Sequence, residues 1–191
     1  MTDVLKEKNG VLVEGHIKIF DPETKEVFIN KRNAIHYENM SIALARSIAN
    51  QGQGWIYEMS FGNGGTSVDP TGIITYLTPN STGTNASLYN QTYTKVVDDR
   101  SINNTDPVRN KIDIRHVSGT NYTDVLVTCL LDYGEPSGQD AFDTASNPSS
   151  LFVFDELGLK GWNPNGTGDL LTHVIFHPVQ KSLNRLIQID Y

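Results

Sequence analysis

The sequence predicts a mainly β fold: an antiparallel β-sandwich with one α-helix and long loops. Hydrophobic residues make up 38% of the 191 residues and charged residues 19%, and Asn, Thr, Ser and Gly supply much of the rest, a balance typical of β-rich proteins with polar loops. Short stretches of alternating apolar and polar residues recur between turn formers, without the helix-strand alternation of a parallel sheet. We therefore expect a single domain over residues 1–191, with a flexible N-terminal arm at 1–9 and a long loop at 134–150.

The first predicted elements form a β-hairpin. Residues 10–20 alternate, residues 26–30 resume strand character, and the residues from Asp21 to Thr24 are turn formers. Gly15 is expected to mark a β-bulge. The apolar face of the first strand would consist of Val11, Val13, Ile17 and Ile19.

One helix is predicted, at about residues 39–50. Met40, Leu44 and Ile48 recur at four-residue spacing, which places them on one face of a helix. We expect that face to be buried. Asn39 is expected to cap the N-terminus of the helix, and Gly52 to end it.

Strand patterns dominate the rest of the chain. Turn-rich stretches separate them, above all at residues 78–87 and 134–150, and loops as long as the second are usually functional or ordered by a partner. The predicted strands cover residues 55–61, 72–77, 93–97, 111–117, 124–132, 151–154, 170–176 and 183–191.

A glycine-rich run, Gly62-Asn63-Gly64-Gly65, follows the predicted strand that ends at Phe61. The run looks like a phosphate-binding loop, but its glycine spacing fits no such motif, and neither a lysine nor a helix follows it. Turn formers follow instead. We expect a sharp structural turn with glycines at positive φ, close to a subunit contact and without bound phosphate.

Charge and composition exclude several classes of function. The formal net charge is -7 and the basic residues are scattered, so we expect no direct contact with nucleic acid. Cys129 is the single cysteine and lies in an apolar run, which indicates a buried, inert thiol. No apolar run approaches the roughly 18 residues that span a membrane. The N-terminus does not resemble a signal peptide, so we expect synthesis in a reducing cytoplasm and no membrane contact.

A structural role is the better interpretation of each candidate catalytic or metal-binding residue. His173 and His177 would share one face of a strand roughly 13 Å apart, too far for a single metal. His36 and Glu38 would be a base and its orienting residue in an enzyme, but capping the helix or contacting a neighbour is the better interpretation.

Two pairs of adjacent carboxylates are further candidates for acid-base chemistry. The pairs Asp98-Asp99 and Asp155-Glu156 are expected to be solvated turn residues. We expect no catalytic residue, metal or cofactor, and no enzymatic activity.

Two segments carry a resemblance to a known class of proteins. They are GHIKIFDPETKEVFINKRNAIHYENMSIALARSIAN followed by FGNGG, and FDELGLKG followed by LLTHVIFHPVQKSLNRLIQIDY. Together, over roughly residues 10–65 and 150–191, they resemble virion structural proteins of contractile-tailed bacteriophages. In such proteins an E-[LI]-G-L turn precedes a strand, an F-x-P-V-x-K segment and a final alternating strand.

The resemblance implies a structural subunit located in the virion. We expect a neck or collar protein at the head-tail junction that assembles into a multimeric homo-oligomeric ring and contacts portal, connector, tail terminator or sheath proteins. A capsid decoration protein, a tail terminator and a baseplate subunit remain alternatives. The residues expected to shape the fold or its interfaces are Asn33, His36, Tyr37, Glu38, Phe61, Gly62, Asn63, Gly64, Gly65, Glu156, Gly158 and Leu159.

Two other functions compete with this one. A carbohydrate- or receptor-binding module would use Trp55, Trp162 and the long Asn- and Gly-rich loops. A hydrolase, the weakest alternative, would use His36 and Glu38.

Overall fold

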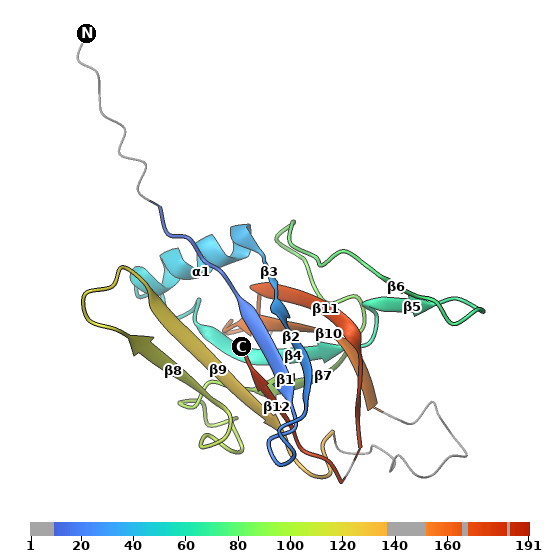
Figure 1. Ribbon diagram of the computed structural model, residues 1–191. Helices are drawn as coiled ribbons and strands as arrows, with labels where there is room; N and C mark the ends of the chain where they lie inside the picture. The colour runs from blue at the N-terminus through green and yellow to red at the C-terminus, as the bar shows by residue number, and fades with distance from the viewer. Residues whose placement is uncertain (1–9, 137–151, 166–167, 183) are drawn as a thin grey trace.

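Two five-stranded antiparallel sheets form the body of the molecule (Figure 1). The computed structural model describes residues 10–136, 152–165, 168–182 and 184–191. The strand orders are β2-β1-β12-β9-β8 and β3-β11-β10-β4-β7, and β5 and β6 form a separate two-stranded sheet. The predicted mainly β, sandwich-like fold is confirmed. The N-terminal arm predicted at 1–9 and most of the loop predicted at 134–150 lie outside the described residues.

One helix and twelve strands are present in the described residues. They are β1 His16–Phe20, β2 Val27–Arg32, β3 Ala34–Ile35, α1 Tyr37–Ile48, β4 Ile56–Gly62, β5 Thr66–Val68, β6 Ile74–Tyr76, β7 Gln91–Val96, β8 Lys111–His116, β9 Thr123–Leu131, β10 Phe152–Gly161, β11 Thr172–Lys181 and β12 Ile187–Asp190.

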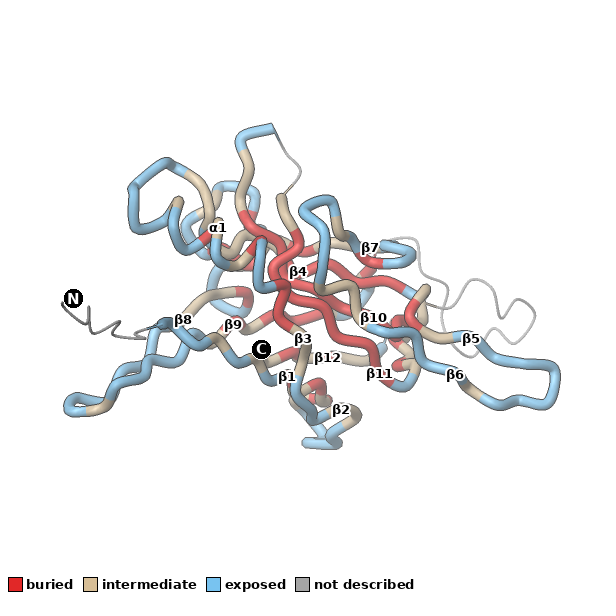
Figure 2. Tube along the Cα trace, turned by 90° about the horizontal axis from the view of Figure 1, so that it is seen from above, coloured by how far each residue is buried: buried red, intermediate tan, exposed pale blue. Residues whose placement is uncertain are grey.

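The core lies between the two sheets (Figure 2). Aliphatic side chains of β1, β9 and β12 face aromatic and aliphatic side chains of β4, β10 and β11. Phe154 packs edge-on against Phe61 at 5.4 Å and against Phe176 at 5.7 Å between ring centroids, a favoured aromatic geometry. Cys129 is buried among these side chains, and burial raises the pKa of its thiol to about 12.

The predicted N-terminal hairpin is present, but it begins later than expected. Strand β1 starts at His16, and Val11 and Leu12 are exposed. The Asp21 carboxylate accepts hydrogen bonds from the backbone amides of Glu23 and Thr24, which fixes the turn. Gly15 lies before the strand, and the bulge predicted there occurs instead between Ile19 and Phe20.

Helix α1 begins two residues earlier than predicted, and its caps differ from those expected. The side chain of His36, not Asn39, caps it by accepting a hydrogen bond from the Asn39 amide. At the other end Asn50 adopts a left-handed conformation with φ of 51°. The amides of Asn50 and Gln51 then bond back into the last turn, which is a Schellman motif. Gly52 lies beyond this stop. No helix in the described residues is long and apolar enough to cross a membrane.

The buried face of α1 is not the one that its apolar spacing indicated. Asn39 and Ala43 are buried, whereas Leu44 is 37% and Ile48 85% exposed. The Asn39 side-chain amide donates to the Leu170 carbonyl, so a polar residue faces inward at little cost. The apolar stripe of the helix therefore faces outward.

Strands β10 and β11 are longer than predicted. The segment FDELGLKG, expected to contain a turn, is the continuation of β10 and pairs with β4 and β11. Strand β11 continues through Pro178, beyond the predicted end at Phe176. It can do so because the register shifts between Phe154 and Glu156 of its partner and leaves Pro178 outside the regular ladder. This irregularity lets Phe154 and Leu157 both enter the core although they are three residues apart.

The outer face of the second sheet is covered by the segment of residues 77–90, which links β6 to β7. Hydrogen bonds join this segment to His36, His173 and Glu156. Leu88, near its C-terminal end, is buried. We call residues 77–90 the strap. The strap gives the second sheet a covered outer face, which explains why β10 is buried along most of its length.

Candidate functional site

The adjacent carboxylates Asp155 and Glu156 bind the chain that leaves strand β4. Asp155 accepts hydrogen bonds from the Gly65 amide at 2.9 Å and from the amide and hydroxyl of Thr66. Glu156 accepts one from the Gly64 amide at 3.1 Å. Both carboxylates are buried, so the prediction of solvated turn residues is wrong. We call residues 62–66 the glycine loop, because its backbone amides hold carboxylates of the same chain.

The glycines are required by close approach and not by positive φ. A β-carbon on Gly62 would lie 2.5 Å from the Asn90 carbonyl oxygen, and one on Gly64 would lie 2.8 Å from the Asn90 nitrogen. None of Gly62, Gly64 and Gly65 has a positive φ, so that part of the prediction is wrong. Asn63 is exposed, and its side-chain oxygen accepts a hydrogen bond from the side-chain amide of Asn90 at 2.5 Å.

Glu156 also fixes the strap to the outer face of the second sheet. Its carboxylate accepts hydrogen bonds from the backbone amides of Tyr89 and Asn90 at 2.9 and 2.8 Å and contacts His173 Nε2 at 3.0 Å. The Asn80 amide donates to His173 Nδ1 at 2.8 Å. Nδ1 is thus an acceptor, and the ring donates through Nε2 to Glu156.

The pKa of Glu156 reflects these contacts. Burial by itself would raise it, but the hydrogen bonds from His173, Asn90, Tyr89 and Gly64 outweigh burial and hold the pKa of the carboxyl below its ordinary value. The ionised carboxylate is therefore the form that the fold stabilises.

His36 and its neighbours form the start of the helix. His36 is fully buried, with Nδ1 accepting from the Asn39 amide and Nε2 donating to the Gly83 carbonyl at 2.9 Å. Both ring nitrogens are thus engaged by backbone groups, as the capping interpretation expected. Tyr37 and Glu38 are exposed on the helix surface.

The other residues that were expected to shape the fold or its interfaces lie apart from one another. Phe61 and Leu159 belong to the core. A β-carbon on Gly158 would lie 2.6 Å from the Thr172 carbonyl oxygen, so strand packing requires the glycine. Asn33 donates to the Tyr191 hydroxyl, and its own side-chain oxygen is buried without a hydrogen-bond partner.

His177 lies on the same strand as His173 but is exposed, with its ring 3.2 Å from the Tyr76 hydroxyl. Within the described residues, no group of three or more His, Cys, Asp or Glu side chains is placed to hold a metal ion.

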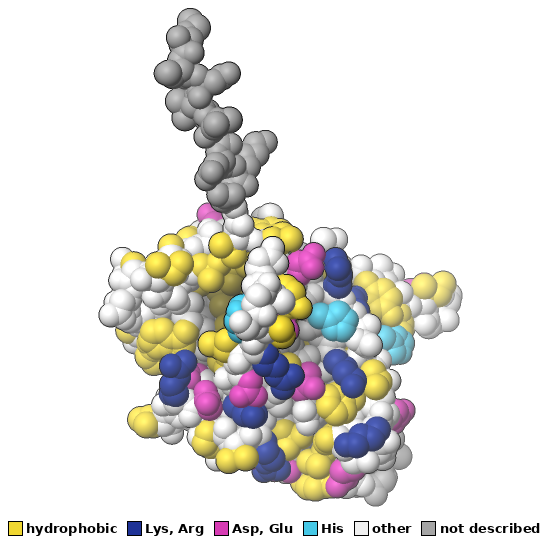
Figure 3. Space-filling model, turned by 60° about the vertical axis from the view of Figure 1, so that its left-hand side comes forward, with side chains coloured by type: hydrophobic (Ala, Val, Ile, Leu, Met, Phe, Trp, Pro, Cys, Tyr) yellow, Lys and Arg dark blue, Asp and Glu magenta, His cyan; other side chains and the backbone are white. Residues whose placement is uncertain are grey.

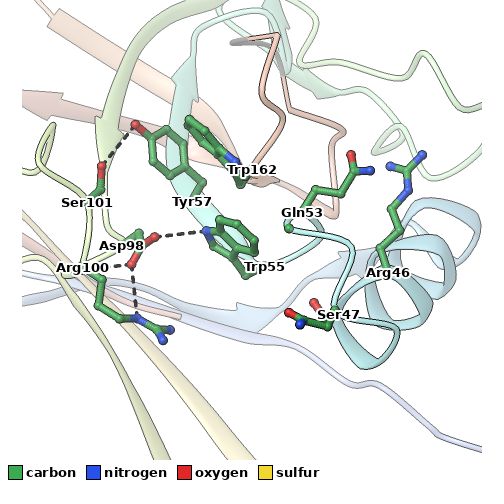
Figure 4. Close-up of a pocket in the computed structure, with 11 residues that line it drawn as sticks. Arg46, Ser47, Gln53, Trp55, Tyr57, Asp98, Arg100, Ser101 and Trp162 are labelled. Atoms are coloured by element: carbon green, nitrogen blue, oxygen red, sulfur yellow. Dashed lines mark hydrogen bonds and ion pairs between the residues drawn. The ribbon is translucent and has the colours of Figure 1, made fainter.

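An open cleft of about 520 Å³ lies between the C-terminal end of α1 and the start of β4 (Figure 4). Trp55 and Tyr57 of the β4 region and Trp162 after β10 line it. The two indole planes are inclined by 14° with centroids 6.2 Å apart, and Tyr57 lies 4.7 Å from Trp162. We call this site the aromatic cleft; its lining residues are Arg46, Ser47, Asn50, Gly52, Gln53, Trp55, Tyr57, Asp98, Arg100, Ser101 and Trp162. It brings together Trp55 and Trp162, the pair named in the alternative ligand-binding prediction.

Hydrogen bonds hold two of these rings in place. Trp55 Nε1 donates to a carboxylate oxygen of Asp98 at 3.1 Å, and the Asn103 side chain donates to the Tyr57 hydroxyl at 3.0 Å. Asp98 is buried, which corrects the prediction that it is a solvated turn residue. The sequence offered no sign of this role, because Trp55 and Asp98 are 43 positions apart.

Substituting Gly62 with alanine should destabilise the fold, because the new β-carbon would meet the Asn90 carbonyl. We expect a loss of about 1–3 kcal/mol in the free energy of unfolding, measured by chemical denaturation. Gly10→Ala is the matched control, since the space around Gly10 is open, and should change the value by less than about 0.5 kcal/mol. Equal stability of the two variants would contradict the close-approach account.

Glu156→Gln should lower stability at neutral pH by about 1.5–3 kcal/mol, because an amide cannot accept every bond that the carboxylate accepts. Since the folded pKa of Glu156 lies below its unfolded value, its contribution is complete above the unfolded pKa of about 4.3 and is lost as the pH falls through the folded pKa. The difference between wild type and variant should therefore shrink in acid. Denaturation at several pH values measures it, with exposed Asp124→Asn as control. A difference that does not vary with pH would oppose this assignment.

Comparison with known proteins yields no match to this chain, whether against family models, curated proteins or solved structures.

Proposed function

We propose that this chain is a structural subunit of a tailed-phage virion, a neck or collar protein that assembles into a multimeric ring at the head-tail junction. The resemblance of its two terminal segments to such proteins supports the virion role. The observation that carries the proposal is the exposed apolar face of the β5-β6 hairpin.

The β5-β6 hairpin is amphipathic, and its apolar face is only partly covered: Ile74 is half-buried, and the Tyr76 hydroxyl lies 3.2 Å from His177 of β11. Val68 pairs with Ile74 and Thr66 with Tyr76, which places these side chains on one face, whereas Ser67 pairs with Thr75 on the other. Val68 is 62% and Tyr76 50% exposed. An isolated two-stranded hairpin is marginally stable in water, and an exposed apolar face of this kind is typical of a contact surface.

The base of the hairpin is fixed, while Val68 and Tyr76 on its apolar face stay largely exposed. Asp155 binds Thr66, the first residue of β5, and the Leu77 amide donates to the Gly65 carbonyl at 2.9 Å. The hairpin therefore leaves the sandwich in a defined direction, as an arm that reaches a neighbour would require. It projects beyond the second sheet (Figure 1).

A second apolar projection lies at the opposite end of the molecule (Figure 2). In the β8-β9 hairpin the pair Ile112 and Val127 faces the core, but the next pair on the same face, Ile114 and Val125, is 75% and 49% exposed. Exposed hydrophobic side chains also form patches on the face shown in Figure 3. Two different apolar ends favour a head-to-tail contact, which produces a ring when the rotation closes.

Subunits at other positions in the particle would need the same apolar surfaces. A capsid decoration protein, a tail terminator or a baseplate subunit would also need an arm directed at a neighbour. The neck position is the more specific form of the proposal, with portal, connector, tail terminator or sheath proteins as neighbours.

Placing a charge on the apolar face of the arm should abolish assembly. We expect the purified wild-type protein to form oligomers in light scattering, and the double variant Val68→Asp with Tyr76→Asp to be monomeric, because desolvating a carboxylate opposes the contact. Ser67→Asp with Thr75→Asp, on the opposite face of the same strands, is the matched control and should still assemble.

Two results would contradict the proposal. A wild-type protein that stays monomeric, alone and with purified portal or tail ring proteins, would exclude the assembly role. Electron cryomicroscopy of the particle would overturn the specific position if the subunit were found away from the neck.

A further inference from the structure

We infer that the aromatic cleft binds a neutral sugar ring, a hexopyranose unit of an oligosaccharide. The inference goes beyond the assembly role and does not rest on it, since the cleft lies at the C-terminal end of α1 and the β5-β6 arm leaves the other end of β4. A saccharide-binding virion subunit and a saccharide-binding protein of another kind would both contain this site.

The aromatic rings match the apolar face of a sugar. A pyranose ring presents C–H groups on its faces and hydroxyl groups around its edge, so it packs flat against an aromatic ring. Trp55, Tyr57 and Trp162 form a continuous set of rings for this contact. Because Asp98 holds Trp55 and Asn103 holds Tyr57, little side-chain entropy is lost when a ligand binds.

Polar side chains around the rings match the hydroxyl groups. Asn50 and Gln53 carry amides, each with donors and an acceptor, and Ser47 and Ser101 carry hydroxyls. A few placed polar groups on an aromatic base are the usual composition of a small-ligand site, and the volume of about 520 Å³ falls within the size range of such sites. A purely apolar ligand would remove water from these polar groups without replacing its hydrogen bonds.

The charges of the cleft favour a neutral ligand. Arg46 is 3.3 Å from the carboxylate of Asp169, and Arg100 is 3.8 Å from that of Asp98. Each arginine thus lies beside a carboxylate, which weakens the attraction of the cleft for a phosphate or an acidic sugar. The cleft is open to solvent and Trp55 is 37% exposed, which leaves room for the next units of a chain.

The chain contains only two tryptophans, and both line the cleft, so tryptophan fluorescence, excited selectively over that of the eight tyrosines, reports on this site alone. We would titrate the full-length protein with tetrasaccharides built from glucose, galactose, mannose or N-acetylglucosamine. At least one should shift the emission to shorter wavelength and protect the tryptophans from acrylamide quenching, because a stacked sugar ring displaces water from the indoles. Failure of all four to change either quantity would overturn the inference.

Variants localise the binding. Isothermal titration calorimetry should show at least about a tenfold weaker affinity for Trp162→Ala and for Gln53→Ala. Trp55→Phe should weaken binding less, because it keeps an aromatic face. Tyr122→Ala, on an exposed turn outside the cleft, is the control and should bind as the wild type does.

The same variants test the location of the sugar site and its independence from the assembly arm. If a saccharide binds equally well to Trp162→Ala and Gln53→Ala, both with wild-type thermal stability, the sugar occupies another surface and the inference is wrong. Assembly of the Trp162→Ala variant into wild-type oligomers would show that the cleft and the assembly arm act separately.

Discussion

The buried carboxylate of Glu156 is the constraint on which the outer half of this fold depends. A carboxylate without water must be surrounded by donors, and here the donors come from three separate places in the sequence: Gly64, the end of the strap at Tyr89 and Asn90, and His173. Satisfying one charge therefore fixes the glycine loop, the strap and strand β11 relative to one another. The same geometry explains the glycines, since backbone amides reach the carboxylate only where no β-carbon intervenes.

The direction of the β5-β6 arm follows from this network. Asp155, next to Glu156, binds the first residue of β5, so the arm starts at a point held by two adjacent carboxylates. The aromatic cleft lies at the opposite end of β4 and is organised by a different buried carboxylate, Asp98. In both places an acidic side chain is buried because it positions a neighbouring group, and neither residue belongs to the hydrophobic core.

The sequence predicted the sandwich, the single helix and most strands, because alternation and turn formers are local properties. The prediction failed where the structure depends on contacts between residues that are distant in the sequence. The buried face of α1 depends on a bond from Asn39 to the Leu170 carbonyl, 131 positions away. The local sequence predicts Asp155 and Glu156 to be surface residues, because it does not show that the amides of the glycine loop lie beside them. The alternative ligand-binding prediction places Trp55 and Trp162 in one site, but no sequence pattern reveals Asp98, which orients Trp55.

Amide hydrogen exchange, measured by NMR on the wild-type protein, tests this account most directly. If Glu156 binds the loop and the strap, the backbone amides of Gly64, Tyr89 and Asn90 should exchange as slowly as amides inside the sheets, although Gly64 and Tyr89 lie outside the sheets' hydrogen-bond ladders. The exposed turn amide of Gly119 provides the reference for rapid exchange. Exchange of the three amides at the rate of Gly119 would contradict the central role of the Glu156 carboxylate.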